Sequence, residues 1–326
     1  MIIVTGGAGF IGSAIVAALN ARGIDDIVIV DILGEDGKWK NLRRLKFADY
    51  VEADEFLDMF TAGDIDNSVE TVFHMGACSD TTETDCSYLV KNNYEFSKLL
   101  ANWAVESGAR FIYASSAATY GDGAQGFVDN ADDLDKLIPL NMYGYSKHMF
   151  DLWARRTGLL KTIVGLKYFN VFGPNEYHKA NMRSFVIKAF EQINAKGRVG
   201  LFKSYHPEYA DGEQLRDFIY VKDAVDMTLF FMDNQDLAGL YNIGTANARN
   251  WNDLAKATFA AMNKEPQIDY IEMPQHLKAK YQYYTKADTT KLQNAGYNKE
   301  TTSLEDAIKD YVQNYLMLGG YLSGAE

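Results

Sequence analysis

The sequence predicts an α/β protein with a doubly wound parallel sheet and a smaller, mixed α/β domain toward its C-terminal end. Short apolar runs alternate with helical patterns in the first half of the chain, which is typical of a parallel sheet covered by helices. A glycine-rich turn joins the first run to the first helix, and the alternation stops after Asn170. The 326 residues are enough for one large or two modest domains.

Five apolar runs are expected to form buried strands, at Ile2–Thr5, Ile27–Val30, Thr71–Gly76, Phe111–Ser115 and Ile163–Tyr168. Helical periodicity is found between and after them, at Ile11–Arg22, Tyr88–Glu106, Tyr143–Arg156, Ser184–Lys196 and Asn252–Met262. The segments Arg216–Asp223 and Tyr241–Gly244 are expected to return to the first domain. The predicted domains are therefore interleaved: residues 1–169 with 215–244 bind the coenzyme, and residues 170–214 with 245–326 bind the substrate.

Composition limits the possible partners. The net charge is −12 and the pI is about 4.9, which argues against nucleic acid or an anionic membrane surface as a partner. The chain begins with a predicted strand rather than a basic or long apolar segment, and its two cysteines are typical of a reducing compartment, so we expect a cytoplasmic protein. The five histidines and two cysteines show no metal-ligand spacing, and no metal site is predicted.

The turn "VTGGAGFIG" places Gly6, Gly9 and Gly12 between a strand and a helix. Glycines allow a tight turn, close approach of a pyrophosphate and close packing of helix on strand, while the helix N-terminus attracts the phosphates. Asp31 follows 19 residues after Gly12, at the end of the second strand. This context predicts a Rossmann-type dinucleotide site.

The choice between NAD and NADP stays open. Asp31 can accept hydrogen bonds from the adenosine ribose, which favours NAD. Lys38, or Arg43 or Arg44, can instead meet the 2′-phosphate of NADP. The end of the fourth strand is expected to line the coenzyme through Met75, Gly76, Ala77, Cys78 and Ser79, with Cys78 as a packing residue rather than a nucleophile.

Tyr143 and Lys147 are four residues apart, which on a helix puts them on one face. A nearby lysine cation favours the phenolate, so Tyr143 can take a proton from a carbinol while hydride leaves to the nicotinamide. Ser116, or else Ser115, ends the fifth strand and can orient the reacting oxygen. These residues predict a carbinol oxidoreductase site.

Several stretches resemble a known family. The glycine turn, the two serines, "GYSK", "YFNVFGP" and "RDFIYVKD" resemble the extended short-chain dehydrogenase/reductases. Within that superfamily, "FHMGACSDTTE", "GYSKHMFD", "YFNVFGPNEYHKANM" and "LKAKYQYYTKADTTKL" are similar to ADP-L-glycero-D-manno-heptose 6-epimerases. The resemblance implies a homo-oligomer, a pentamer, with tightly bound NADP. It also implies interconversion of the C6 epimers of ADP-glycero-manno-heptose, a lipopolysaccharide core precursor.

The resemblance also implies roles for individual residues. Tyr143, Lys147, Ser116 and a second acid/base, Lys179, are the implied catalytic residues. Further coenzyme positions are Phe10, Ile11, Asp31, Ile32, Lys38, Met75–Ser79, Asn92, Lys147, Val171 and Lys179. The implied substrate positions are Ser116, Asn170, Asn181, Lys188, Phe202, Lys203, Ser204, Tyr205, Arg216 and Tyr281. The chain departs from the family pattern at Ile32, Ala53, Asn181 and Lys188.

Two other functions are weighed against this one. A 4-epimerase or 4,6-dehydratase of nucleotide sugars shares the fold, but "SSAATYG" lacks the Asp-Glu pair of a dehydratase and a 4-epimerase does not need Lys179. An NAD(P)-binding redox sensor would be expected to lose Tyr143 or Lys147. A second base at Lys179 requires a lowered pKa, because a lysine in water stays protonated.

Overall fold

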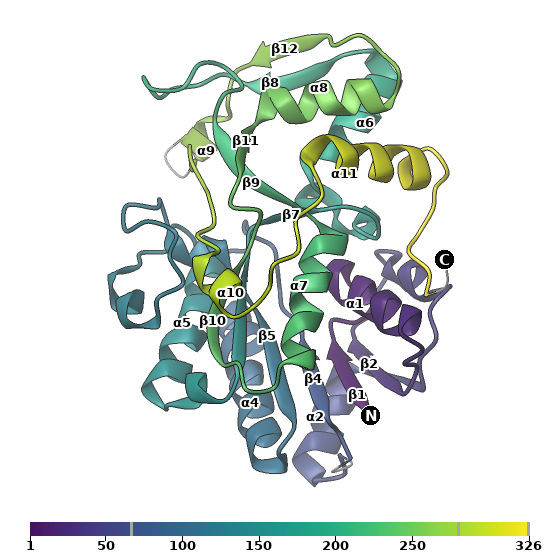
Figure 1. The fold of residues 1–326 in the computed structure, drawn as a ribbon, viewed down its shortest axis with the longest axis vertical. Coiled ribbons are helices and arrows are strands. Elements are labelled where there is room, and N and C mark those ends of the chain that lie inside the picture. The colour runs from purple at the N-terminus through teal and green to yellow at the C-terminus, as the bar shows by residue number, and fades with distance from the viewer. Residues whose placement is uncertain (66–67, 279–280, 325–326) are drawn as a thin grey trace.

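A computed structural model describes residues 1–65, 68–278 and 281–324. Its main sheet has seven parallel strands in the order β10-β6-β5-β4-β1-β2-β3 (Figure 1). The strands are β1 (Ile2–Thr5), β2 (Ile27–Asp31), β3 (Asp49–Glu52), β4 (Thr71–His74), β5 (Arg110–Ser116), β6 (Val164–Tyr168) and β10 (Gly239–Ile243). The order reverses between β1 and β4, and doubly wound sheets bind ligands in the crevice at that point.

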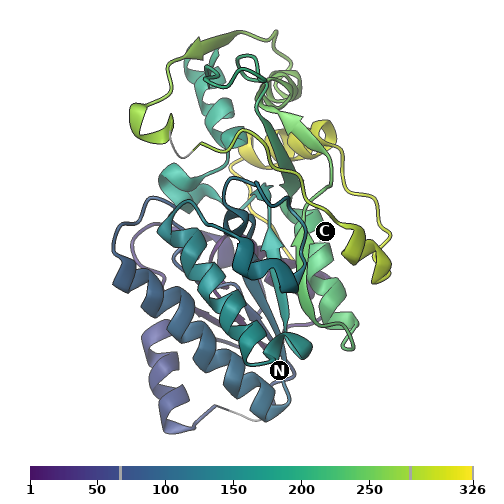
Figure 2. The ribbon, with the colours of Figure 1, turned by 90° about the vertical axis from the view of Figure 1, so that its left-hand side faces the viewer.

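Helices cover both faces of this sheet (Figure 2). One face packs on α2 (Ala53–Ala62), α4 (Phe96–Ser107) and α5 (Met142–Arg156), and the other packs on α1 (Phe10–Ala21) and α7 (Val221–Asp233). The helix before α4 is continuous but irregular, with α3 (Cys86–Leu89) followed by the π-helical η2 (Val90–Glu95). Two buried apolar clusters, one on each face, therefore hold the sheet rigid beneath the crevice.

The second part of the chain lies beyond the carboxyl ends of the main strands (Figure 1). A three-stranded sheet pairs β9 (Leu215–Tyr220) with β7 (Asn170–Phe172) and β11 (Ala248–Asn250), and β8 (Val199–Phe202) pairs with β12 (Ile268–Ile271). The helices there are α6 (Phe185–Lys196), α8 (Trp251–Ala261), α9 (Gln275–Lys278) and α11 (Leu304–Asp310), which continues into the π-helical η7 (Tyr311–Leu316). The short helix α10 (Thr290–Asn294) packs beside β10 of the main sheet instead (Figure 1). Short 3-10 turns complete the structure at η1 (Lys38–Leu42), η3 (Ala117–Tyr120), η4 (Ala131–Lys136), η5 (Leu159–Lys161) and η6 (Tyr177–Met182).

The structure confirms the predicted fold class, a doubly wound parallel sheet with a smaller mixed domain. Residues 241–243 join the main sheet through β10, as expected. The strand part of Arg216–Asp223 does not return there, because β7 and β11 supply its backbone partners; only α7, which begins at Val221, packs against α1. The predicted division into domains remains an expectation. Within the described ranges, we find no helix long and apolar enough to cross a membrane.

Candidate active site

The glycine turn lies directly against the end of β4. Gly6 has a φ of 65°, and a Cβ added there would come within 2.7 Å of the Cα atom of Gly76. A Cβ on Gly12 would lie 2.1 Å from the carbonyl oxygen of Gly6. A larger residue at either position would displace the turn from the point where the strand order reverses. The two glycines therefore allow the N-terminus of α1 to reach the crevice.

Asp31 holds the turn from the end of β2. Its Oδ2 atom accepts hydrogen bonds from the amides of Ala8 and Gly9, at 2.9 and 3.1 Å. Its Oδ1 atom lies 3.2 Å from the Nζ atom of Lys38. The Asp31 carboxylate therefore already has hydrogen-bond and charge partners within the protein. Lys38, which is expected to bind a 2′-phosphate, lies beside it.

Two cavities open along the crevice, of about 380 and 680 Å³. The smaller one is lined by the glycine turn, Asp31, Lys38 and residues 75–79, which fits the phosphate and ribose groups of a dinucleotide. The larger one reaches into the second part of the chain. They share the side chains of Phe10, Met75 and Lys179, so the two cavities form a continuous path for a coenzyme and its substrate.

Tyr143, Lys147 and Ser116 line the larger cavity together. The first two come from α5, and Ser116 ends β5. Burial raises the pKa of Tyr143, and a hydrogen bond with the Ser116 hydroxyl acts in the opposite direction. The tyrosine expected from the spacing thus has a hydroxyl partner at the mouth of the sheet.

Lys147 is only 5 % exposed, and burial lowers its pKa to about 8 while Asp151 raises it. The sequence led us to expect that this lysine lowers the pKa of Tyr143. In the structure the desolvation of the phenol prevails, and the pKa of Tyr143 lies above its ordinary value. A positive charge beyond Lys147 is needed before the phenolate forms near neutral pH.

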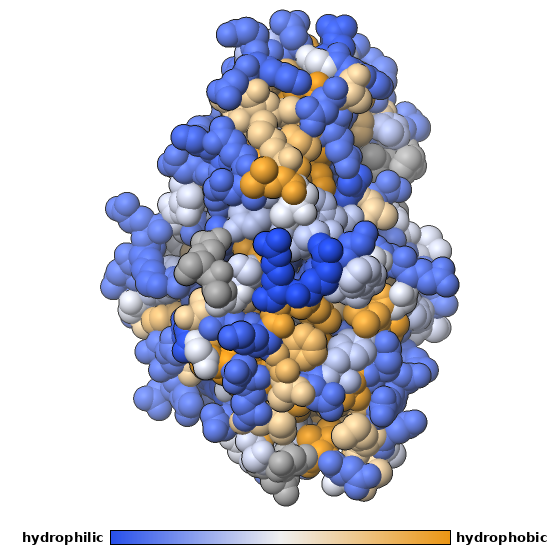
Figure 3. All heavy atoms as spheres, turned by 90° about the vertical axis from the view of Figure 1, so that its right-hand side faces the viewer, coloured by the Kyte–Doolittle hydropathy of each residue, from blue (hydrophilic) through white to orange (hydrophobic). Residues whose placement is uncertain are grey.

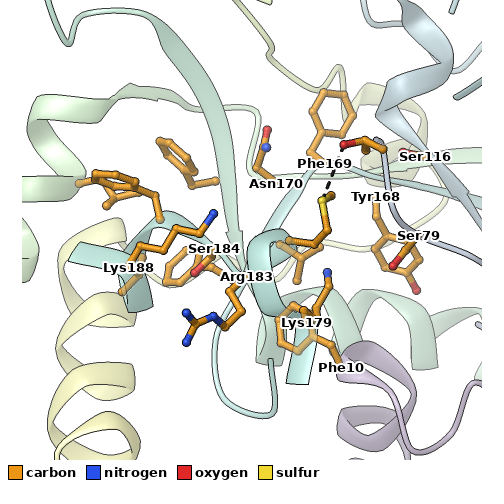
Figure 4. Close-up of a pocket in the computed structure, with 18 of the residues that line it drawn as sticks. Phe10, Ser79, Ser116, Tyr168, Phe169, Asn170, Lys179, Arg183, Ser184 and Lys188 are labelled. Carbon is orange, nitrogen blue, oxygen red and sulfur yellow. Dashed lines mark hydrogen bonds between the residues drawn. The ribbon is translucent and has the colours of Figure 1, made fainter. Parts of the chain in front are cut away.

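Lys179 lies in η6, and its Nζ atom is 5.4 Å from the centre of the Phe10 ring at the start of α1 (Figure 4). Burial lowers the pKa of Lys179, and the nearby carboxylate of Glu176 opposes this effect. His178 lines the smaller cavity, and burial lowers its pKa to about 4, so it is neutral at pH 7. Lys179 therefore has the environment that a lysine base requires.

Comparison with known proteins agrees with this geometry. The model of the NAD dependent epimerase/dehydratase family matches residues 2–244. An ADP-L-glycero-D-manno-heptose-6-epimerase of Nitratidesulfovibrio vulgaris is 54% identical over 97% of this chain and 98% of its own. The enzyme of that name from Fusobacterium nucleatum is 49% identical, with 97% and 98% covered. The chain belongs to the ADP-L-glycero-D-manno-heptose-6-epimerase family.

A solved structure supports the same assignment. The Helicobacter pylori ADP-L-glycero-D-manno-heptose-6-epimerase has a TM-score of 0.82 and 29% identity, and the match covers 96% of this chain and 95% of that one. The NAD dependent epimerase/dehydratase model covers every residue that lines the smaller cavity, and the coenzyme of this protein is a nicotinamide dinucleotide.

Most of the predicted positions line the cavities of this epimerase-family fold. Those at the smaller cavity are Gly6, Gly9, Phe10, Ile11, Gly12, Asp31, Lys38, Met75, Gly76, Ala77, Cys78, Ser79 and Lys179. Those at the larger one include Ser116, Tyr143, Lys147, Asn170, Val171, Lys188, Phe202 and Tyr281. Among the described residues, the predicted positions outside both linings are Ile32, Asn92, Asn181, Lys203, Ser204, Tyr205 and Arg216.

Arg216 forms the contacts of its guanidinium with other groups of the protein. It donates hydrogen bonds to the carbonyl oxygens of Leu215 and Gln282, and its guanidinium lies 5.1 Å from the centre of the Tyr281 ring. The neighbouring Asp217 is buried and accepts hydrogen bonds from the turn at residues 245–246. Arg216 thus supports the cavity wall through Tyr281.

Asn93 is a residue beside the site that the sequence patterns did not predict. Its side chain bonds both backbone groups of Cys78, accepting from the amide at 2.8 Å and donating to the carbonyl at 2.9 Å. Asn92, which the resemblance implied, donates to the carbonyl of Tyr88 one helical turn earlier. The π-helical turn η2 shifts the phase of this helix, so a regular helical period could not show which asparagine contacts the chain at Cys78. The described residues contain no cluster of three potential metal ligands.

Proposed function

We propose that this protein interconverts ADP-D-glycero-D-manno-heptose and ADP-L-glycero-D-manno-heptose by epimerisation at C6. The observation that carries the proposal is the presence of two proton-transfer groups, Tyr143 and Lys179, in the lining of one cavity. They come from separate elements, α5 and η6, so they approach a bound sugar from different directions. The assignment also rests on the names of the relatives at 54% and 49% identity.

Inversion at a carbinol carbon requires oxidation to a carbonyl and reduction on the opposite face. A bound nicotinamide coenzyme supplies the hydride acceptor and donor for this sequence. Tyr143 holds or takes the proton at its phenol oxygen for one epimer, with the Ser116 hydroxyl orienting the reacting oxygen. Lys147 binds the nicotinamide ribose and contributes positive charge beside the phenol.

Lys179 serves the other epimer. When the 6-ketone turns in the pocket, its oxygen leaves Tyr143 and needs a second group that exchanges a proton. Lys179 carries a lowered pKa and lines both cavities, so it can hold that proton near the coenzyme end of the sugar site. Lys188, also at the larger cavity, offers a positive charge for the ADP diphosphate.

The finer features of this proposal concern the coenzyme and assembly. Lys38 lines the smaller cavity beside Asp31, which favours NADP as the coenzyme through its 2′-phosphate. We also propose that the protein works in the cytoplasm as a homo-oligomer, a pentamer as in the family it resembles, in the synthesis of lipopolysaccharide core precursors. Mass measurement of the native assembly tests the pentamer.

The experiment is incubation with ADP-D-glycero-D-manno-heptose, followed by NMR of the C6 signals, for the parent protein and for Lys179→Met. The parent should form both epimers. Lys179→Met should lose at least about 10²-fold in rate, the usual contribution of a general acid or base, and keep its bound coenzyme.

Lys196→Met provides a matched control, because Lys196 is an exposed lysine in the last turn of α6 and lies outside both cavities among the described residues. Its rate should equal that of the parent. Turnover of UDP-galactose without turnover of the heptose would replace the proposal by a 4-epimerase. A Lys179→Met variant as fast as the Lys196→Met control would reject the second base.

A further inference from the structure

The loop that carries Lys179 is tied to a distant part of the chain. The three residues Gly320–Leu322, here called the C-terminal strap, lie beside the loop residues 175–177. In Figure 1 the chain passes from α11 in the upper part of the molecule down to its C-terminal end near α1. The same flank, seen in Figure 3, mixes hydrophobic and hydrophilic surface. The strap thus joins the two parts of the fold on the flank behind the Lys179 loop.

Asn175 is the first anchor. Its backbone has a φ of 77°, a left-handed conformation that costs energy for most residues, and its side chain is fully buried. Its Nδ2 atom donates to the Ser13 hydroxyl of α1 at 2.9 Å, and its Oδ1 atom accepts from the amide of Leu322 at 3.0 Å. One asparagine therefore connects the coenzyme helix, the loop and the strap.

Tyr177 is the second anchor, two residues before Lys179. Its hydroxyl donates to the carbonyl oxygen of Gly320 at 2.9 Å, and its ring centre lies 5.0 Å from that of Tyr321. The guanidinium of Arg43 covers the Tyr321 ring at 4.9 Å. Arg43, which the sequence offered as a phosphate ligand, instead holds the strap from the outside.

Asn41 closes the connection to the glycine turn. Its Nδ2 atom donates to the carbonyl oxygens of Ala8 and Asn175, at 2.9 and 3.0 Å, and the side chain is 1 % exposed. The backbone of the loop is thus bonded to the same turn that forms the coenzyme cavity. Lys179 follows these contacts within four residues and points at Phe10, the first residue of α1 (Figure 4).

We propose that Asn175 and Tyr177 are positioning residues that, together with the C-terminal strap, hold Lys179 at the meeting point of the two cavities. This inference rests on the proposed role of Lys179 as the second acid/base. Neither anchor lines either cavity among the described residues, so each acts through the lysine rather than on the substrate.

The physical reason is the freedom of a loop lysine. A lysine side chain has four rotatable bonds, and a loop without anchors would let it turn into water. A displacement of about 1 Å at a reacting group costs about 10²-fold in rate. Exposure would also remove the burial that lowers the pKa of Lys179, and this pKa would rise toward 10.5, the ordinary lysine value.

Several ionisable groups surround Lys179. Glu176 and His178 belong to its own loop. The other titratable or charged groups at the smaller cavity are Asp31, Asp36, Lys38, Cys78 and Asp80, and those at the larger cavity are Tyr143, Lys147, Tyr168, Arg183, Lys188 and Tyr281. Glu176 is the one that shifts the pKa of Lys179, upward, and burial exceeds its effect. Because the anchors carry no charge, removing them changes the exposure of Lys179 and leaves this set of charges intact.

The test is Asn175→Gly, since glycine adopts the left-handed backbone without strain and removes only the side-chain bonds. The variant should lose about 10- to 10²-fold in kcat for epimerisation, with KM and coenzyme content unchanged. For one of the two epimers, the one that Lys179 deprotonates, the low-pH limb of the kcat profile should move to higher pH. In the coenzyme-free protein, the amides of residues 176–182 should exchange hydrogen faster than in the parent.

Asn263→Gly is the matched control, because Asn263 also has a positive φ, 53°, and is exposed after α8. It should match the parent in all three measurements. Tyr177→Phe and the deletion of residues 320–326 remove other contacts between the loop and the strap, so they test the inference even if Asn175→Gly folds poorly. The deletion should shift the same pH limb, and Tyr177→Phe should do so more weakly because it keeps the ring contact.

If a variant only loses folded protein, the maximum of its kcat–pH profile falls, but the low-pH limb stays at the same pH. That result in all three variants, or variants with the kcat and exchange rates of the parent, would overturn the inference, provided that Lys179→Met still abolishes turnover. If Lys179→Met itself keeps its activity, the proposed function fails first. The two failures are therefore distinguishable.

Discussion

Replacing Asp151 with alanine should destabilise the fold by about 3–5 kcal/mol, the usual cost of leaving one charge of a buried pair alone. Asp151 is fully buried in α5, and Lys167 of β6 is 1 % exposed. Their charged atoms are 2.7 Å apart. The substitution strands the ammonium of Lys167 inside the sheet, where water cannot replace the lost carboxylate.

The magnitude follows from the contacts of the carboxylate. Asp151 also accepts hydrogen bonds from the hydroxyls of Tyr113 and Ser115, each at 2.8 Å. Hydrogen bonds to a charged group contribute about 1.5–3 kcal/mol each, but contributions within one network are not additive. Lys167 keeps a second bond, to the Thr119 hydroxyl at 2.6 Å, which limits the loss to the range expected for one broken pair.

Urea unfolding of the coenzyme-free protein measures the effect, with the midpoint compared at unchanged m-value. The double variant Asp151→Ala/Lys167→Met should recover part of the loss, because it removes the stranded charge. The matched control is Asp133→Ala, which breaks the exposed pair between Asp133 and Lys136 and should leave the midpoint almost unchanged. Equal shifts for the two single variants would refute the reasoning.

Two further predictions concern the coenzyme. Lys38→Ala should weaken binding of NADP by about tenfold or more and leave NAD binding nearly unchanged, as measured by calorimetry on coenzyme-free protein, whereas the exposed neighbour variant Lys40→Ala should affect neither. Since burial lowers the pKa of Lys147 to about 8, its ammonium is present below that pH and lost above it. Coenzyme affinity should therefore fall as the pH rises through about 8, and Lys147→Met should remove that dependence.

The sequence predicted the parts of the site whose geometry is local. The glycine turn and Asp31 are placed by one strand-helix-strand unit, β1-α1-β2, and Tyr143 and Lys147 share a helix face because the spacing along α5 is regular. The choice between Asn92 and Asn93 was not accessible, because the π-helical turn η2 breaks that regularity. The position of Arg216 was not accessible either, since Gln282, which accepts one of its hydrogen bonds, is 66 positions away along the chain.

The two lysines of the site show why residue type alone does not assign a role. Both are desolvated, but Lys147 projects from a regular helix whose next turn presents Asp151, and this carboxylate favours the charged form. Lys179 projects from a short 3-10 turn whose order depends on Asn175, Tyr177 and the strap. A lysine on a rigid helix beside a carboxylate is suited to bind coenzyme hydroxyls as a cation. A partly buried lysine held by uncharged anchors is suited to exchange a proton, because small changes in its exposure decide its protonation state.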